Sequence, residues 1–435
     1  MADSFHPLAL EANEAIGQTH AALLTAFSAR GKSVYFPRTG ILGQSAEAKN
    51  AKLNATIGIA LNDDGSPMHL PLFDELVNLD PKDVYPYASS YGKEELRQIW
   101  KNMLSEKNPS LKSMTTTPVV CAGLTHALAV AGLLFADPGD EIILPDRFWD
   151  NYTLLFEHLC GAALKTYATF KGNAFDTKSF RTALLARTGK RIILFNFPNN
   201  PSGYSPTAKE VQEIVDAIRA SAKQGSTVIV ILDDAYFGLV YEQGVERESL
   251  LSYLADLHER VLVVKIDGAT KEDFVWGHRV AFITFAVKGM SEKCAKALEA
   301  KAAGTVRETT SNAPHLSQSL LLKLYASPEY REQKKHAATV LERRYLAVCD
   351  AVKGGKYDEC FRALPFNSGY FMCVELAKGL DAETVRRRLL EKYGTGVIAL
   401  GNLLRVAYSS LPEDSIGEVF SNIAAACREL SLSPS

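Results

Sequence analysis

A lysine and an arginine eight residues apart could serve one anionic ligand. In "GATKEDFVWGHR" (268–279), Lys271 lies in a loop after an expected strand, and Arg279 begins the next strand. Two cations beside one loop suit an anion, and a lysine in a partly desolvated cleft can have its pKa lowered enough to act as nucleophile and base. Lys265 is the competing lysine, but it lies within the strand pattern itself. The spacing therefore favours amine chemistry near Lys271.

A carboxylate ends a second apolar run, "VIVILDDAYFGLVY" (228–241). Asp233 follows an almost wholly apolar strand, and Tyr236 comes three residues later. A buried carboxylate is unfavourable unless a cation meets it, so we expect a basic residue or a ligand as its partner. The alternative is a helix N-cap, a role that suits Asp234 at least as well.

An amide-rich turn, "NFPNNPSGY" (196–204), follows the apolar run "RIILF". Pro198 and Pro201 restrict the backbone, Gly203 allows a tight turn, and Asn200 can present its amide to a cleft. As a lone turn it would mean little, but we expect it at the same sheet end as Asp233.

Two further strand ends carry groups that suit a flat, phosphorylated ligand. In "CAGLTHALAV" (121–130) the chain turns at Gly123 into a helix whose first residues are Leu124 and Thr125, and a helix N-terminus with a hydroxyl can bind phosphate. A glycine turn with a threonine cap is the alternative. In "RFWDNYTLLF" (147–156), Trp149 and Tyr152 could stack on a flat ring or simply pack in the core.

These residues need a sheet that brings strand ends together. Between about residues 118 and 290, short apolar runs alternate with helical periods: "PVVCA", "EIILP", "ALKTYA", "RIILFNF", "TVIVILDD", "RVLVVKI" and "VAFITFAV". Such alternation predicts an α/β fold with a mostly parallel sheet covered by helices on both faces. A ligand should then lie at the carboxyl ends of the strands.

Length and composition restrict the class of protein. The 435 residues predict two lobes, and a net charge of −2 with 23% charged residues favours neither a nucleic acid nor a membrane surface as partner. No apolar run approaches the roughly 20 residues of a membrane span, and "MADSFHPLALEANEAIG" lacks a signal pattern, so we expect a cytoplasmic protein. The seven cysteines are odd in number and indicate neither disulfides nor a metal site.

Taken in order, four motifs resemble those of fold-type I pyridoxal 5′-phosphate (PLP) enzymes, and among them the class I/II aminotransferases of the aspartate and aromatic type. "NNPSG" is similar to the family's N-P-[ST]-G turn, "DDAY" to D-x-A-Y, "ATKEDFVWGHR" to [ST]-K with an arginine eight residues on, and "LLRVAYS" to its C-terminal R-[ILV] strand. The resemblance implies a large PLP-binding domain whose mostly parallel sheet is sandwiched by helices, and a smaller α+β domain. We place the N-terminal arm and part of the small domain at 1–55, the large domain at 56–325 and the C-terminal small domain at 326–435.

The resemblance also implies a role for each residue. Lys271 would form the Schiff base (internal aldimine) with PLP and then move a proton from substrate Cα. Asp233 would pair with the pyridine nitrogen, Asn200 and Tyr236 would contact the ring oxygen, and Trp149 would stack on the ring. The phosphate would be bound by Gly123, Leu124, Thr125, Thr270 and Arg279.

A second copy of the chain is implied by "YPYASSYGKEELR" (85–97), which is similar to a segment whose tyrosine reaches the neighbouring subunit's phosphate. We assign that role to Tyr87 rather than Tyr85. The expected assembly is a homodimer with shared sites.

Substrate residues follow from three similarities. Arg405 in "LLRVAYS" matches the arginine that binds the α-carboxylate, and a planar fork suits a carboxylate. Arg307 in "VRETTSNAP" matches an arginine that reaches across the dimer to a distal carboxylate; the alternative is a surface arginine paired with Glu308. Ile57 and Gly58 match a loop near the substrate. The implied reaction moves an amino group between aspartate, glutamate or an aromatic amino acid and a 2-oxo acid such as 2-oxoglutarate, with Asn200 also near the substrate.

The chain departs from the family pattern at three positions. Gly268 stands where many relatives have a serine hydroxyl, and Trp276 and His278 stand where other residues are usual. Other reactions of the cofactor class, aspartate β-decarboxylation or C–S cleavage, would keep every cofactor contact. A PLP-binding regulatory domain without catalysis is a remote alternative, and no G-x-G-x-x-G favours a nicotinamide enzyme.

Overall fold

A seven-stranded sheet forms at the seven apolar runs. The computed structural model describes residues 5–432; residues 1–4 and 433–435, which belong to the predicted terminal regions, lie outside it. The strands are β2 (Val119–Cys121), β3 (Glu141–Pro145), β4 (Ala163–Tyr167), β7 (Lys190–Asn196), β8 (Thr227–Asp233), β9 (Val261–Asp267) and β10 (Ala281–Val287). Their order is β2-β10-β9-β8-β7-β3-β4, and β10 alone runs antiparallel to its neighbours. The α/β fold and the mostly parallel sheet are confirmed.

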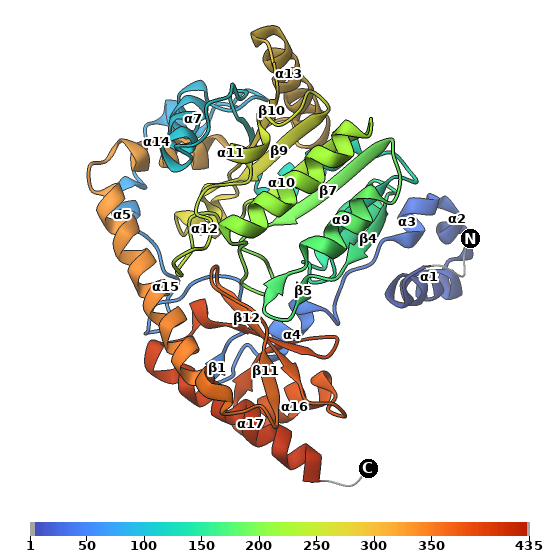
Figure 1. Ribbon diagram of the computed structural model, residues 1–435, viewed down its shortest axis with the longest axis vertical. Helices are drawn as coiled ribbons and strands as arrows, with labels where there is room; N and C mark the ends of the chain where they lie inside the picture. The colour runs from blue at the N-terminus through green and yellow to red at the C-terminus, as the bar shows by residue number, and fades with distance from the viewer. Residues whose placement is uncertain (1–4, 433–435) are drawn as a thin grey trace.

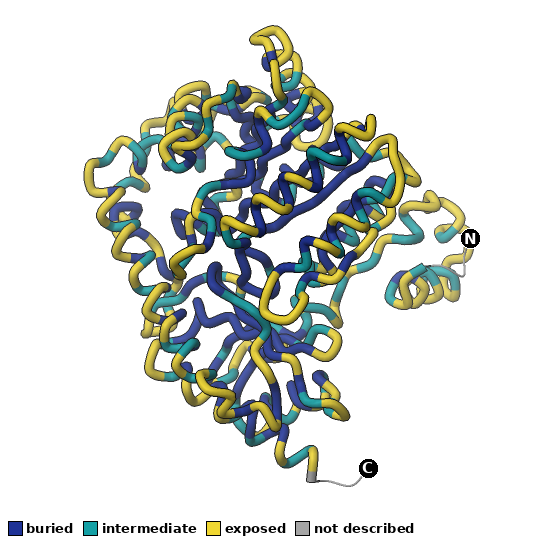
Figure 2. The backbone as a smooth tube through the Cα atoms, in the orientation of Figure 1, coloured by how far each residue is buried: buried dark blue, intermediate teal, exposed yellow. Residues whose placement is uncertain are grey.

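Both faces of this sheet are buried, because successive side chains of a strand point to opposite sides. In β8, Ile229 and Ile231 join one hydrophobic cluster, whereas Val228 and Val230 join another. The central strands are accordingly the dark, buried stretch of the tube in Figure 2. A doubly covered sheet leaves its strand ends as the place where polar groups can gather.

Helices cover the two faces. Helices α9 (Thr177–Leu185), α10 (Ala208–Lys223) and α11 (Leu251–Leu254) pack on one face; α9 and α10 lie in front of the sheet in Figure 1. The other face carries α8 (Leu124–Phe135), α13 (Glu292–Thr309) and α14 (His315–Ala326), with α7 (Glu94–Lys107) beside α14. Short elements at the edges are α5 (Leu72–Leu76), α6 (Pro81–Val84), the π-helix η2 (Thr153–Leu159), β5 (Phe170–Lys171), β6 (Ala174–Phe175), α12 (Ala269–Glu272) and η3 (Trp276–His278).

The smaller lobe has a core of its own around a four-stranded antiparallel sheet. The strand order is β11 (Phe361–Ala363), β12 (Phe371–Leu376), β15 (Leu403–Ala407), β14 (Ile398–Leu400). Helices α16 (Ala382–Tyr393) and α17 (Ile416–Leu432) complete it, with the one-turn helices η4 (Lys353–Gly355), η5 (Tyr408–Ser410) and η6 (Glu413–Ser415). The core of this lobe also includes Leu53 and Ala55, and the division of the chain at 326–435 remains a prediction.

A 23-residue helix, α15 (Tyr330–Val352), joins the two lobes along one side of the molecule in Figure 1. At the small-lobe end, Arg344 Nη1 donates to the carbonyl oxygen of Ser409 at 2.5 Å. At the other end, the hydroxyl of Tyr330 donates to Asp273 of the large lobe, so this one helix contacts both lobes.

Much of the N-terminal segment is helical. Helices α1 (Pro7–Thr19), α2 (Ala21–Ala26) and α3 (Ala29–Ser33) extend from the side of the large lobe (Figure 1). Helix α4 (Ile41–Glu47) and β1 (Leu53–Asn54) then reach the small lobe, where β1 pairs in parallel with β13 (Thr395–Gly396). Within the described residues, no helix combines the length and the apolar character that crossing a membrane requires.

Candidate active site

A cavity of about 410 Å³ opens at the carboxyl ends of the central strands, between the two lobes. Of the predicted site residues, those that line it are Ile57, Gly58, Leu124, Thr125, Trp149, Asn200, Asp233, Tyr236, Thr270, Lys271, Arg279 and Arg405. Tyr152, Asn196, Trp276 and Phe371 also line it, as do Ile41, Leu42 and Ser45 of α4. The cavity combines an apolar wall with three cations and one buried acid.

Asp233 ends β8 with its side chain in this cavity. It is 3% exposed, and its Oδ2 accepts a 2.5 Å hydrogen bond from the Tyr152 hydroxyl. Its Oδ1 is buried and has no hydrogen-bond partner among the described residues. Burial raises the pKa of Asp233 against the opposing effects of Tyr152 and Lys271. A carboxylate in this state is suited to receive a cationic or N–H-bearing ligand.

Lys271 faces the same space from the one-turn helix α12. Its Nζ lies 5.2 Å from the centre of the Tyr236 ring. Burial lowers the pKa of the amine to about 8, with Asp233 acting to raise it and Arg279 to lower it. A lysine with this pKa is partly neutral near physiological pH and can act as a nucleophile or a base.

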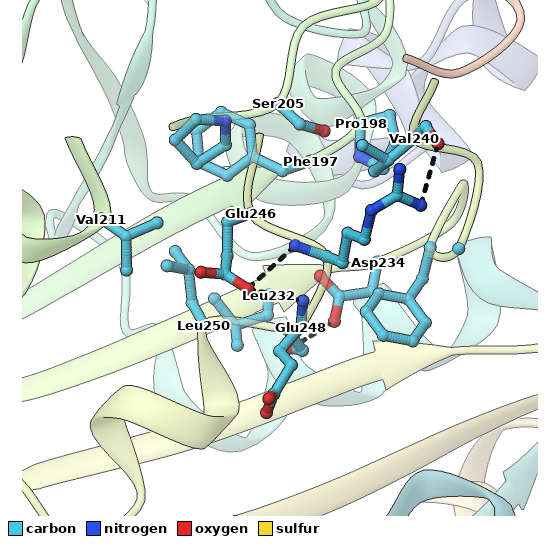
Figure 3. A pocket seen from close by; sticks show the side chains of 15 residues that line it. Phe197, Pro198, Ser205, Val211, Leu232, Asp234, Val240, Glu246, Glu248 and Leu250 are labelled. Carbon is cyan, nitrogen blue, oxygen red and sulfur yellow. Dashed lines mark hydrogen bonds between the residues drawn. The ribbon is translucent and has the colours of Figure 1, made fainter. Parts of the chain in front are cut away.

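Lys265, the alternative lysine of the sequence analysis, lies in a buried ion cluster instead of the cavity. Lys265 is fully buried in β9, where its Nζ contacts Asp234 at 2.8 Å and Asp267 at 2.7 Å. Ser249 donates a 2.6 Å hydrogen bond to Asp234. Figure 3 shows the Asp234 carboxyl among the side chains that line a small cavity of about 20 Å³, which Pro198 and Leu250 line as well. Asp234 therefore belongs to a buried ion cluster behind the sheet end, and Asp233 alone faces the large cavity.

Arg279 lies against the start of α8. Gly123 precedes that helix with φ 87°, and a Cβ there would come within 2.5 Å of an Arg279 nitrogen. Only glycine combines this left-handed backbone with so close a guanidinium. Arg279 therefore lies beside the N-terminus of α8, and a guanidinium next to a helix N-terminus is suited to an anion.

Steric crowding explains why residue 268 is a glycine. A Cβ at this position would lie 2.8 Å from the carbonyl oxygen of Val280 and 2.9 Å from Cα of Ala281. Because β9 and β10 approach so closely here, a serine could enter only if the backbone moved. The departure from the family pattern follows from local packing.

Arg405 lies in β15 of the small lobe and points across to the large one. It is 2% exposed; Nη1 donates to Asn200 Oδ1 and Nη2 to the carbonyl oxygen of Thr56, both at 3.1 Å. Its Nε is buried without a partner among the described residues, and its guanidinium carbon lies 4.4 Å from the centre of the Phe371 ring. The guanidinium is oriented by both lobes and keeps donor capacity for an anion.

The three asparagines of the amide-rich turn make different contacts. Asn196 donates to the carbonyl oxygen of Asp233 and accepts from the backbone N–H of Asn200, both at 2.7 Å. Asn199 accepts hydrogen bonds from the backbone N–H and hydroxyl of Ser202, at 3.0 and 2.6 Å. Asn196 and Asn199 thus hold the turn, and Asn200 is left to face the cavity.

Two of the residues assigned from the sequence lie away from this chain's own cavity. Tyr87 is 90% exposed, and Arg307 is exposed in the last turn of α13. Tyr85, the other tyrosine of that segment, is exposed as well. Their assignment to a neighbouring subunit's site remains a prediction.

Sequence reasoning missed the contacts of Tyr152 and Asn196. The sequence predicts that Tyr152 stacks on a ligand or packs in the core, whereas its hydroxyl donates to Asp233 and its ring meets Trp149 edge-on, with the ring centres 5.6 Å apart. The available signal was an alternation of polar and aromatic residues after β3, which does not reveal what a hydroxyl will contact.

Comparisons with known proteins agree with this arrangement. Residues 72–423 match the sequence profile of the family described as "Aminotransferase class I and II". The chain is 25% identical over 233 residues to a probable N-acetyl-LL-diaminopimelate aminotransferase of Bacillus subtilis (51% of this chain, 55% of that protein). It is 26% identical over 200 residues to an aspartate aminotransferase of Sulfurisphaera tokodaii (45% and 47%). It thus spans about half the length of these two relatives.

The fold is also that of a solved aminotransferase. The crystal structure of an aminotransferase from Anaerococcus prevotii superposes with a TM-score of 0.82 at 22% identity, covering 92% of this chain and 98% of the other. At this identity the similarity shows a shared fold.

Proposed function

Because this chain belongs to the class I and II aminotransferases, we propose that it moves an amino group between an L-amino acid and a 2-oxo acid such as 2-oxoglutarate. The observation that carries the proposal is the meeting of Lys271, Asp233 and Arg405 at one cavity. A tuned amine, a buried acid and a guanidinium with free donor capacity are the three groups that amino transfer requires of the protein.

The cofactor of this family is PLP, which when bound supplies an electron sink for bonds at the substrate's Cα. The residues present fit it. The unpartnered Oδ1 of Asp233 is suited to a protonated ring nitrogen, whose positive charge would counter the raised pKa of this carboxyl. Arg279 and the start of α8, with Thr125 and Thr270, would hold the phosphate.

The remaining cofactor contacts would come from the turn and the loop after β8. We propose that Asn200 and Tyr236 contact the ring oxygen and that Trp149 covers the ring. Lys271 would hold the cofactor covalently until a substrate amine releases it. Its Nζ would then take the proton from substrate Cα and return it, a task for which a pKa of about 8 is suited.

Arg405 would orient the substrate through its α-carboxylate. Its contacts with Asn200 and the Thr56 carbonyl oxygen hold the guanidinium in place before substrate arrives, and its Nε has donor capacity to spare. Ile57, Gly58 and Phe371 would bound the side-chain space. We propose aspartate, glutamate or an aromatic amino acid as the donor.

We propose further that the active form is a cytoplasmic homodimer with shared sites. Tyr87 and Arg307 are exposed on this chain, which is compatible with contacts to a second copy. Tyr87 would reach the partner's phosphate, and Arg307 would meet a distal carboxylate of its substrate.

The test uses the purified full chain loaded with PLP. Single amino acids are added, the visible absorbance of the cofactor is followed, and the 2-oxo acid released is identified by mass spectrometry. Aspartate, glutamate or an aromatic amino acid should change the spectrum, and a second 2-oxo acid should restore it. Lys271→Ala is the control and should not turn over.

Other products would point to other reactions at the same cavity. Release of alanine and carbon dioxide from aspartate would indicate β-decarboxylation, and release of ammonia with a thiol or sulfide would indicate C–S cleavage. A spectrum that no amino acid changes would contradict the proposal.

A further inference from the structure

Two acidic residues directly follow Lys271 in the chain. Glu272 is 5% exposed and Asp273 is fully buried. The side chains of neighbouring residues in a helical turn point about 100° apart, so the side chains of Glu272 and Asp273 point in directions different from that of Lys271. Glu272 lines a separate cavity of about 540 Å³, together with Lys107, Tyr325, Tyr330 and Lys334. The two acids are therefore buried behind the proposed active site.

Glu272 is bound by two lysines from two different helices. Lys107, the last residue of α7, contacts its two oxygens at 3.1 and 3.0 Å, and Lys334 in the first turns of α15 contacts Oε1 at 2.7 Å. Burial alone would raise the pKa of Glu272, but the two lysines outweigh it and hold the pKa at about 2. Glu272 is therefore fully ionised and fully paired.

Asp273 has its own set of partners. Lys334 Nζ lies 3.0 Å from Oδ1, and the hydroxyl of Tyr330 donates to the same oxygen at 2.7 Å. The hydroxyl of Tyr325 in α14 donates to Oδ2 at 2.8 Å. Two acids and two lysines thus form a balanced cluster that ties the short helix α12 to α7, α14 and α15.

This balance matters for Lys271 because of its other neighbours. The groups that face its amine are Asp233, Arg279 and the Tyr236 ring. A carboxylate that loses its counter-ion inside a protein favours the protonated form of a nearby lysine, because the interior screens charge only weakly. Were the acids at 272 and 273 left without their lysines, they would add to the effect of Asp233.

We propose that Lys107 and Lys334 are positioning residues for Lys271: they neutralise the two acids that follow it and anchor α12, so that its amine faces the cavity free of their charge. The inference rests on the proposed role of Lys271. Lys334 contacts both acids and has the larger part, whereas Lys107 contacts Glu272 alone.

The test measures the amine of Lys271 directly. The full chain, freed of PLP, is labelled with trace acetic anhydride across a pH series, and acetylation of Lys271 is quantified by peptide mass spectrometry. In Lys334→Met the pH midpoint of labelling should rise by about one unit, so that reactivity at neutral pH falls roughly tenfold. Lys107→Met should shift it by less, and Lys334→Arg should restore most of the original midpoint.

Lys335→Met is the matched control. Lys335 lines the same cavity, is exposed, and has no ion pair among the described residues. Its replacement should leave the midpoint where it is in the original chain.

The outcome separates this inference from a purely structural role. A Lys334→Met protein that unfolds cooperatively and keeps the original midpoint would overturn the proposal, even if its stability is lower. If Lys334→Met does not fold, Lys107→Met decides in the same assay, because it leaves every partner of Asp273 in place. The assay needs no amino acid substrate, so absence of amino transfer would leave its result readable.

Discussion

The hydroxyl of Tyr152 donates a 2.5 Å hydrogen bond to Oδ2 of Asp233, while Oδ1 of the same carboxylate has no hydrogen-bond partner among the described residues. This single contact fixes which oxygen can meet a ligand. It also lowers the pKa of an acid that burial would otherwise raise further. Tyr152 thereby prepares Asp233 for a cationic partner before that partner binds.

Replacing Tyr152 with phenylalanine should weaken cofactor binding. A hydrogen bond to a charged group contributes about 1.5 kcal/mol or more, so the affinity of the PLP-free chain for PLP should fall roughly tenfold. Because Asp233 would then protonate at higher pH, the loss should be greatest on the acid side. Absorbance titration at several pH values measures both effects.

Tyr167→Phe is the control for that variant. The Tyr167 hydroxyl is buried and has no hydrogen-bond partner among the described residues, and it lies on β4 away from the cavity. Its removal should leave PLP affinity unchanged. Equal losses in the two variants would mean that Tyr152 acts only through packing.

Asp233→Asn should reduce the rate of amino transfer while leaving the cofactor attached to Lys271. The amide keeps the shape and the contact with Tyr152 but cannot supply a negative charge. Amino transfer should fall by about 100-fold or more, since a preorganised charge at the reacting group has effects of this size. Stopped-flow absorbance measures transfer, and borohydride reduction with mass spectrometry checks that Lys271 still carries the cofactor. Transfer at the original rate would contradict the role of Asp233.

Removing the Lys271 amine should stabilise the cofactor-free chain at neutral pH. The pKa of this lysine is about 8 instead of 10.5, so below pH 8 the lysine is a cation in both states, but only folding buries that charge. Lys271→Met should raise the free energy of unfolding by about 3 kcal/mol at pH 7, since one pKa unit corresponds to about 1.4 kcal/mol. Between pH 8 and 10.5 the gain should disappear, because the folded amine is already neutral while the unfolded one still loses its proton. Urea unfolding at pH 7 and pH 10.5 makes the comparison.

Arg405→Lys should affect substrate more than cofactor. A lysine cannot keep the contacts with Asn200 and the Thr56 carbonyl oxygen while offering a planar pair of donors to a carboxylate. We expect kcat/KM for every amino acid substrate to fall roughly 10- to 100-fold with little change in PLP affinity. A similar loss in PLP affinity would instead point to a collapsed cavity.

Arg307→Ala tests both the distal carboxylate and the shared site. If Arg307 serves the partner's substrate, kcat/KM should fall about tenfold or more for aspartate and glutamate but not for phenylalanine. Mixing Arg307→Ala with Lys271→Ala chains should then restore one complete site per mixed dimer, measured as aspartate turnover above that of either variant. No recovery in a mixture shown to exchange subunits would argue against a shared site.

Much of the fold was predictable because its signals are local and strong. Seven apolar runs with helical periods between them lead to a mostly parallel sheet, and β10 as the one antiparallel strand was the detail that periodicity could not show. The positions of Asp233 and Lys271 at or just after strand ends follow from the same pattern, whereas Arg405 lies within β15 and was assigned from the resemblance of its motif. That the three side chains meet in one cavity depends on contacts between distant segments, and it is seen only in the folded chain.

The rest depended on contacts between segments far apart in sequence. Tyr152 and Asp233 are separated by 81 positions, and Lys107 and Glu272 by 165. Nothing in "KED" tells whether Glu272 is solvated or buried, since that depends on where α7 and α15 pack. Side-chain orientation across a domain interface is likewise set by packing rather than by local residue preference.

Asn196 links two of the segments that form the site. The Asn196 side chain joins the end of β8 to the turn at 198–201 through two hydrogen bonds. The carboxylate of Asp233 and the amide of Asn200 are therefore held in a fixed arrangement relative to each other. A designer who transfers this chemistry to another parallel sheet should move residues 196–201 together with 233, and should expect Asp233 and Asn200 grafted without Asn196 to lose their mutual alignment.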